Sequence, residues 1–333
     1  MSRTAGRHTI TDVARRAGVS LATVSRVMNG HTSVAPDLAA RVRAAAEELG
    51  YAASPLARSL VLGRTQTIAV VVPDLGNPTF QAILRGLSRA AATDGYHVLI
   101  ADSAEQVSEE RVLAAETRRR SDGLVLCAPR MSDDDLAALV AEVSPVVVIN
   151  RAPQLDAPVV SADYGSALYG LVRHLYGLGH RSLVYLAGTA RSASNAARLA
   201  ALERARSENP DLAVAELPAG VDFDSGAAAA EAVIDSGATG ALAFNDLVAM
   251  GLLSALAERG IRVPDDLSVT GFDDITFARY TSPPLTTATV PAAELGTQAW
   301  AAMLALLRGE QTPQDRIFAA DLALRGSTAS PRS

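Results

Sequence analysis

The stretch ITDVARRAGVSLATVSRVMNG, residues 10–30, predicts two short helices joined by a tight turn. Small or apolar side chains recur there at i, i+3, i+4 and i+7, which places them on one helix face: Ile10, Val13, Ala14 and Ala17. Gly18 can adopt the left-handed conformation that ends such a helix. Two short helices connected in this way form a helix-turn-helix, whose second helix fits the major groove of DNA.

The flanking residues complete a small three-helix domain. Thr9 and Asp12 have the spacing of a capping box, and Ser20 can cap the second helix through its hydroxyl. A third helix is expected to begin at Pro36 and to end at Gly50. The segment from 54 to 63 also starts as a helix does, but it is shorter than the ~12 to 15 residues that an isolated helix needs in water.

Charge divides the chain into two parts. The net charge is -6 overall, yet residues 1–64 hold nine arginines against four acidic residues, a net of +5. The remaining 269 residues carry a net charge of -11. A small basic module on a large acidic body suits the binding of nucleic-acid phosphates by one end of the chain.

From residue 67 onward, β-branched apolar runs alternate with stretches of helical periodicity, as buried parallel strands do. The runs are 68–72, 97–101, 123–127 and 146–149, followed by 182–187, 213–217, 241–244 and 267–272. They predict two doubly wound α/β units in tandem with a cleft between them.

Polar and aromatic residues follow these strands, where ligands bind in open α/β sheets. They are Asn77, Phe80, Asp102, Asn150, Arg151, Asn245 and Asp273. Such residues offer donors, acceptors and ring faces to a sugar. Each one taken alone could equally cap a helix or make a turn.

The N-terminal motif, with VAPDLAARVRAAAEELGY at 34–51 and LARSL at 56–60, resembles the DNA-binding headpiece of the lac repressor / gal repressor family. The resemblance extends over nearly the whole chain. It implies a set of DNA-binding residues: Thr11, Ser20, Leu21, Ala22, Thr23, Ser25, Arg26, Asn29, Ser33, Tyr51, Ala57 and Leu60. It also implies a hinge helix that forms when two subunits pair over DNA, although Ala53 and Ser54 replace the usual Pro-Asn pair.

The same resemblance names effector-binding residues. Arg198 lies ten residues after Gly188, as the effector-binding arginine of the family does, and Asp273 lies in a GFDD segment that matches GYDD. Asn245 matches a further motif, and Phe223 stands where an aromatic ring often stacks on the ligand. Ala201 replaces a usual glycine, so helix packing near Arg198 is expected to differ.

The expected fold is an N-terminal all-α helix-turn-helix headpiece followed by an α/β core that resembles periplasmic binding proteins, with two doubly wound parallel-sheet subdomains. The expected domains are a headpiece at 1–53, a hinge helix and linker at 54–65, a core at 66–326 and a disordered tail at 327–333. Within the core the subdomains are expected at 66–161 with 291–317, and at 162–290 with 318–326.

The functional hypothesis is a homodimeric, sequence-specific repressor of carbohydrate-metabolism genes, released from a palindromic operator by a sugar-like effector. A corepressor such as a purine or sugar phosphate, a sugar-binding transport protein, a doubly wound enzyme and an architectural DNA-binding protein are the alternatives. No catalytic constellation, metal site or cofactor other than the effector is expected, and Cys127 is the only cysteine. The sequence shows no apolar run of membrane-spanning length and no signal peptide, so a cytoplasmic, nucleoid-associated protein without a membrane partner is expected.

Overall fold

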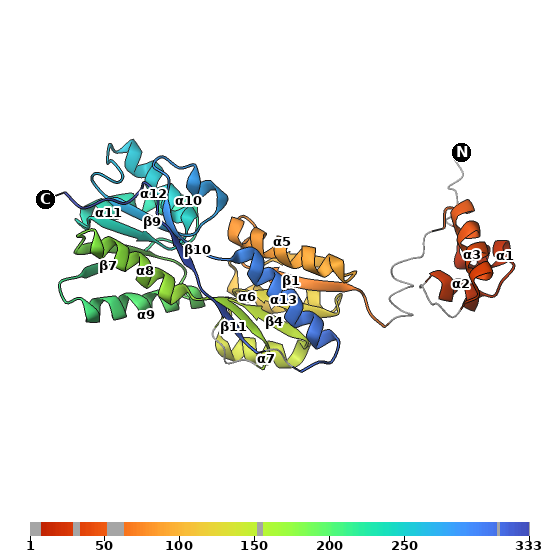
Figure 1. The fold of residues 1–333 in the computed structure, drawn as a ribbon. Helices are drawn as coiled ribbons and strands as arrows, with labels where there is room; N and C mark the ends of the chain where they lie inside the picture. The colour runs from red at the N-terminus through yellow and green to blue at the C-terminus, as the bar shows by residue number, and fades with distance from the viewer. Residues whose placement is uncertain (1–7, 29–33, 52–62, 152–155, 312–313, 333) are drawn as a thin grey trace. The chain divides into compact units, whose positions relative to one another are not determined.

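The computed structural model describes residues 8–28, 34–51, 63–151, 156–311 and 314–332 (Figure 1). The chain forms two compact units, residues 1–66 and residues 67–333. Asn29, Ser33, Ala57 and Leu60, which the sequence assigns to DNA binding, lie outside the described residues together with residues 54–62 of the expected hinge helix and linker at 54–65.

The first unit contains the three expected helices, α1 (Ile10–Ala17), α2 (Leu21–Met28) and α3 (Pro36–Glu48). Its core is made of small apolar side chains from all three helices: Val13, Ala14, Ala17, Val24, Val42, Ala45 and Ala46. The capping box of Thr9 and Asp12 is present, and Gly18 ends α1 with a φ of 66°. The predicted helix-turn-helix is therefore confirmed.

The second unit contains two six-stranded sheets. The first sheet has the order β11-β5-β4-β3-β1-β2, and all of its strands are parallel. Its strands are β1 (Thr67–Val72), β2 (His97–Asp102), β3 (Gly123–Cys127), β4 (Val146–Ile149), β5 (Val159–Ala162) and β11 (Arg316–Phe318).

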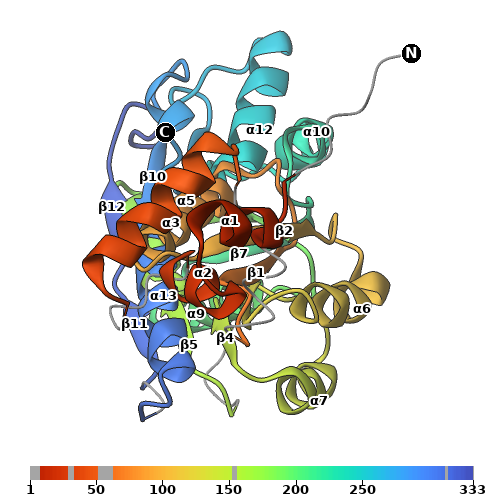
Figure 2. The same cartoon turned by 90° about the vertical axis from the view of Figure 1, so that its right-hand side faces the viewer.

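Alternate residues of strand β1, which lies between β3 and β2, face opposite helical layers of the first sheet. Ile68 and Val70 pack with α5 (Pro78–Thr93) and α13 (Ala292–Leu307). Ala69 packs on the other face with α6 (Val107–Arg118) and α7 (Asp133–Val143). Figure 2 shows α6 and α7 on the opposite side of this sheet from α13. Burial on both faces explains why the strand reads as a continuous apolar run.

The second sheet repeats this arrangement with the order β12-β10-β9-β8-β6-β7, and only β12 is antiparallel. The strands are β6 (Ser182–Ala187), β7 (Ala213–Pro218), β8 (Gly240–Ala243), β9 (Ser268–Asp273), β10 (Thr286–Thr289) and β12 (Asp321–Ala323). Helices α8 (Tyr164–Gly177) and α9 (Ala193–Glu208) pack on one face. The other face carries α10 (Phe223–Ala228), α11 (Ala230–Asp235) and α12 (Asp246–Glu258), and the short helix η1 (Thr276–Arg279) follows β9.

The eight predicted strands correspond to β1–β4 and β6–β9, but sequence patterns missed β5, β10, β11 and β12. These four have three or four residues each and include TTAT and VVSA, which lack a long apolar run. The chain passes between the two sheets three times, after β5, after β10 and after β11. Each subdomain is therefore assembled from separate pieces of sequence.

The expectation of a disordered tail from residue 327 is wrong for its described part. Ser327 is fully buried, and its hydroxyl donates to the Val269 carbonyl at 2.6 Å and accepts from the Thr286 amide at 2.8 Å. The Ala329 amide donates to Ser268 Oγ at 3.0 Å. The small polar residues of this segment led to the prediction of disorder, but in the structure they form hydrogen bonds with buried backbone groups of β9 and β10.

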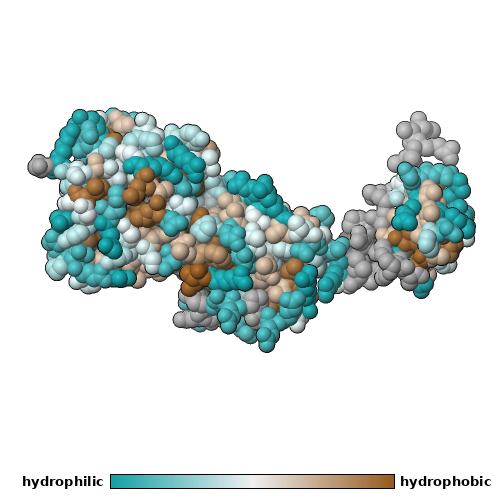
Figure 3. Space-filling model, in the orientation of Figure 1, coloured by the Kyte–Doolittle hydropathy of each residue, from teal (hydrophilic) through white to brown (hydrophobic). Residues whose placement is uncertain are grey.

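Within the described ranges, no helix is both long and apolar enough to cross a membrane. The face drawn in Figure 3 is largely polar, and its apolar residues gather in several small, separate patches. Such patches are ordinary on globular proteins and do not by themselves indicate a docking surface.

Candidate functional site

The first candidate site is the outer face of α2 in the headpiece. Leu21, Ala22 and Arg26 are exposed, and Leu21 has 49% of its surface accessible although it is apolar. Ser20 begins the helix by accepting a hydrogen bond from the Thr23 amide at 3.2 Å. An exposed leucine and alanine beside an arginine can contact thymine methyl groups and a guanine edge in a major groove.

The remaining described DNA-binding candidates surround this face or support it. Thr11 is exposed on α1, whereas Thr23 and Ser25 are half-buried on α2. Tyr51 packs against the headpiece core, so its ring contributes to the fold of this unit.

The second candidate site is a cavity at the carboxyl ends of the strands of both sheets in the second unit. The first sheet and its helices contribute Asp74, Asn77, Thr79, Phe80, Glu105, Ala128, Arg130 and Asn150. The second sheet and its helices contribute Tyr164, Ser194, Arg198, Val221, Phe244, Asn245 and Asp273. This is the place where doubly wound sheets bind ligands.

Arg198 is the central charge of this cavity. It is 1% exposed, and its guanidinium carbon lies 3.9 Å from the ring centre of Phe272, 4.5 Å from that of Phe244 and 4.8 Å from that of Tyr164. Nη1 donates to Ser194 Oγ at 3.2 Å, but Nε has no hydrogen-bond partner among the described residues. A buried, incompletely bonded cation is costly unless another acceptor completes its hydrogen bonds.

Asp273 connects the two halves of the cavity. Its Oδ2 accepts a hydrogen bond at 2.9 Å from the hydroxyl of Thr79, which lies on α5 of the other subdomain. Burial raises the pKa of Asp273 to about 6, although Arg198 and the Thr79 hydrogen bond act in the opposite direction. The carboxylate is thus a hydrogen-bond acceptor whose ionisation falls near neutral pH.

A second aspartate holds the loop that carries Asp273. Asp246 is fully buried, and it accepts hydrogen bonds from the Ile275 amide at 2.8 Å and the Thr287 hydroxyl at 2.6 Å. Burial raises the pKa of Asp246 well above its usual value, and the charge of Asp273 adds to this increase. Asp246 therefore holds the loop of Asp273 in place and does not itself line the cavity.

Left-handed backbone clusters around the cavity. Seven described residues other than glycine have a positive φ, and six of them follow or end β2, β3, β4 or β9: Ala104, Glu105, Ala128, Asn150, Asp273 and Asp274. This conformation costs a non-glycine residue roughly 1–2 kcal/mol. Strain of this kind collects at ligand-binding sites, where surrounding structure maintains it.

The structure brings six of the nine predicted effector residues to the cavity: Asn77, Phe80, Asn150, Arg198, Asn245 and Asp273. Asn77 and Asn245 also cap α5 and α12, so each of them both caps a helix and lines the cavity.

Three predicted effector residues lie elsewhere. Asp102 is exposed and accepts from the Leu75 and Ala104 amides, so it shapes the turns beside the cavity. The guanidinium of Arg151 binds Asp133 at 2.6 Å and two carbonyl groups of the β3–α7 loop. Phe223 is 44% exposed at the start of α10, because Asp222 caps that helix and Val221 takes the lining position.

Sequence reasoning missed several lining residues for identifiable reasons. Tyr164 follows β5, a strand that the patterns did not reveal, and Phe244 was expected inside a strand that ends at Ala243. Arg130 follows β3 after two residues, Ala128 and Pro129, and a charged residue soon after a buried strand was the available signal.

Models of known families match both units. A model described as "Bacterial regulatory proteins, lacI family" matches residues 9–54. A model described as "Periplasmic binding protein-like domain" matches residues 172–328. The two matches agree with the helix-turn-helix headpiece and the doubly wound core.

Relatives match over nearly the full length. The HTH-type transcriptional repressor CytR of Escherichia coli (strain K12) is 33% identical over 327 residues, which cover 96% of both chains. A lac repressor dimer solved with its operator and the anti-inducer ONPF has a TM-score of 0.89 at 27% identity, covering 97% of this chain and 100% of that one. A complex of the regulator CelR with cellobiose has a TM-score of 0.71 at 26% identity, covering 96% and 100%. The chain belongs to the lacI family of bacterial DNA-binding transcriptional regulators.

Proposed function

We propose that the protein is a homodimeric repressor that binds a palindromic operator and releases it when an uncharged, sugar-like effector enters the cavity. The full-length similarity to a lac repressor dimer solved on operator DNA supports the dimer and the operator. Operator binding would place the protein at the nucleoid in the cytoplasm. The similarity to a regulator solved with cellobiose supports a carbohydrate as the effector class.

The observation that carries the effector proposal is the environment of Arg198. Its guanidinium lies against three aromatic rings, and its Nε has no partner among the described residues. A ligand oxygen could accept from this cation, while Asp273 and the amides of Asn150 and Asn245 supply the mixed polar groups that hydroxyls need. The same rings offer apolar faces to a sugar ring.

The position of the cavity supports a switch. Thr79 and Asp273 belong to different subdomains and are hydrogen-bonded across the cavity, so a ligand that contacts both sides changes the balance between subdomain orientations. Coupling of about 1–3 kcal/mol alters operator affinity roughly 5- to 150-fold, which suffices for regulation.

A two-stage experiment tests this function. The full-length protein is first screened by thermal shift against free sugars, nucleosides, purines and sugar phosphates, because ligands of the native state raise the melting temperature. An operator selected from random DNA is then titrated with and without each compound that binds. Weaker operator binding supports induction, stronger binding supports a corepressor, and chemical turnover of the compound would show an enzyme.

The headpiece is tested separately. Arg26→Ala should weaken binding to the selected operator by roughly 1–3 kcal/mol and weaken binding to random DNA less, because Arg26 is exposed where base edges would lie. Fluorescence anisotropy on both DNAs measures the difference. Equal losses of affinity for operator and random DNA would show that Arg26 contacts only phosphates.

A further inference from the structure

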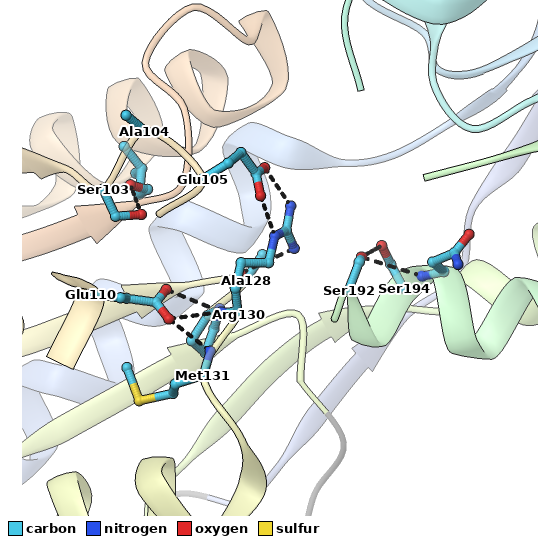
Figure 4. Close-up of polar contacts among 12 residues, drawn as sticks. Ser103, Ala104, Glu105, Glu110, Ala128, Arg130, Met131, Ser192 and Ser194 are labelled. Atoms are coloured by element: carbon cyan, nitrogen blue, oxygen red, sulfur yellow. Dashed lines mark hydrogen bonds and ion pairs between the residues drawn. The ribbon is translucent and has the colours of Figure 1, made fainter. Parts of the chain in front are cut away.

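A second arginine, Arg130, also lines the cavity. Unlike Arg198, it forms an ion pair with a carboxylate of the protein. Arg130 is 5% exposed in the loop between β3 and α7. Its Nε and Nη2 donate to the two carboxylate oxygens of Glu105 at 2.8 and 2.9 Å, and Nη1 donates to the Ala128 carbonyl at 3.1 Å (Figure 4). The pair is bidentate, which is the strongest arrangement of these two groups.

The protein backbone is shaped to bring this pair together. Glu105 and Ala128, which contact Arg130 from the β2 and β3 turns, have φ values of 57° and 44°. Behind them Glu110 is 1% exposed, and it accepts from the Arg130 amide at 2.9 Å and from the Met131 amide at 2.8 Å (Figure 4). Glu105 therefore holds the side chain of Arg130, and Glu110 holds the backbone of its loop.

The acidic groups near the two arginines also differ. Arg130 lies beside two carboxylates, Glu105 directly and Glu110 behind its backbone. Arg198 has no carboxylate within 4.0 Å of its guanidinium among the described residues, and Asp273 is the acidic group that acts on it through space. No strong excess of positive charge therefore faces a ligand on the Arg130 side.

We propose that the Arg130–Glu105 pair is a charge filter that restricts the effector cavity to uncharged, hydroxyl-bearing ligands. The guanidinium uses three of its five N–H groups within the protein, so it keeps donors for hydroxyls. Glu105 is 26% exposed and can accept from the same ligand. Its negative charge repels a phosphate or carboxylate that Arg130 alone would attract. This inference rests on the proposed function, because it names the ligand class of that cavity.

The test removes one charge from the pair. Glu105→Gln keeps the side-chain shape, and the matched control Glu208→Gln removes the same charge from the exposed Arg204–Glu208 pair at the far end of α9. Dissociation constants of the full-length proteins are measured for D-ribose, D-glucose and uridine, each beside its own phosphate monoester. Inorganic phosphate, compared with chloride at equal ionic strength, is the fourth probe.

The wild type and Glu208→Gln should bind uncharged compounds in preference to their monoesters and should show no saturable binding of inorganic phosphate. Glu105→Gln should shift the ratio of dissociation constants toward the monoester by about tenfold or more and should bind inorganic phosphate. The sugar and nucleoside arms show which uncharged ring is preferred. Glu105→Asp, which keeps the charge, should retain the wild-type preference.

Two results would overturn the filter. One is a wild type that binds monoesters as tightly as the parent compounds, and this result does not depend on any variant folding. The other is a Glu105→Gln protein with normal circular dichroism and operator binding that keeps the wild-type ratio and ignores inorganic phosphate. If no organic compound binds the wild type, the proposed effector function fails. The comparison of inorganic-phosphate binding by the wild type and Glu105→Gln still tests whether the pair excludes anions.

Discussion

The two halves of the effector-binding unit have equivalent strand orders and use a buried carboxylate in the same way. In the first half, Glu110 holds the loop that carries Arg130. In the second half, Asp246 holds the loop that carries Asp273. The two halves differ in their arginines, because Arg130 in its loop is already paired with Glu105 whereas Arg198 on helix α9 of the second half keeps an unpartnered Nε.

This difference teaches that the topology brings equivalent loops and helices to the cavity and that their individual side chains determine its chemistry. A charge satisfied within the protein can select among ligands, but it adds little affinity because a ligand replaces no missing partner. A buried charge without its full set of acceptors gains much more when a ligand supplies one. We therefore expect the second half to dominate effector affinity and the first half to dominate selectivity.

The largest effect should come from removing the two buried carboxylates. Asp246→Ala and Glu110→Ala each leave two buried donors without acceptors, so each should lower the free energy of unfolding by about 3 kcal/mol in urea titrations. Only Asp246→Ala should also remove the effector response, because it releases the loop of Asp273. Identical ligand defects in the two variants would contradict the division between the halves.

The next effect compares the two arginines directly. Arg198→Met should weaken effector binding by about 10- to 100-fold, because a charge-assisted hydrogen bond contributes roughly 1.5–3 kcal/mol. Arg130→Met should weaken it less, because Glu105 already uses much of its bonding capacity. Calorimetry with the compound found in the screen measures both values. Equal losses would show that the pairing of Arg130 does not limit its contribution.

The sequence predicted those features that depend on neighbouring residues. The headpiece helices follow from local periodicity, a capping box and a left-handed glycine, and all three are present. Six of the eight predicted strands were found because burial on both faces makes them continuous apolar runs, whereas β2 and β7 are largely exposed edge strands. The four short strands were missed because their stability comes from neighbours distant in sequence, as in the pairing of β11 with β5.

The cavity was only partly predictable for the same reason. Arg198 followed from the family resemblance, and Asn150 and Asp273 from their positions after strands. The rings of Tyr164 and Phe244 reach the cavity because of where β5 and β8 end, which the patterns did not locate. The Arg130–Glu105 pair joins turns that are 25 residues apart, and spacing alone does not indicate such a contact.

The pH dependence of binding tests the role of Asp273 in the second half. Burial raises the pKa of this carboxyl to about 6, so it is ionised above that pH and protonated below it. If the carboxylate accepts from an effector hydroxyl, affinity should fall up to about tenfold as the pH decreases through about 6. Asp273→Asn should bind more weakly and should lack this dependence. A wild-type affinity that stays constant across that range would exclude the carboxylate as the acceptor.

The same pKa predicts a stability effect of known sign. Because the folded carboxyl binds its proton more tightly than the unfolded one, whose value is near 3.8, its ionisation destabilises the native state above pH about 6. The Asp273→Asn protein should therefore gain stability relative to wild type near neutral pH. That gain should shrink as the pH falls toward about 4, which urea titrations at each pH can follow.

The smallest effect concerns the left-handed turns of the first half. Ala104 is exposed and has a φ of 49°, so Ala104→Gly should raise the free energy of unfolding by about 0.5 kcal/mol through relief of strain. The same substitution at exposed Ala301 within helix α13 should lower it by about 1 kcal/mol. Equal losses at both positions would show that the turn stores no strain. Asp273 and Asp274 in the second half adopt the same backbone region, but glycine there would also remove the carboxylates, so only the first half can be relaxed without changing its charges.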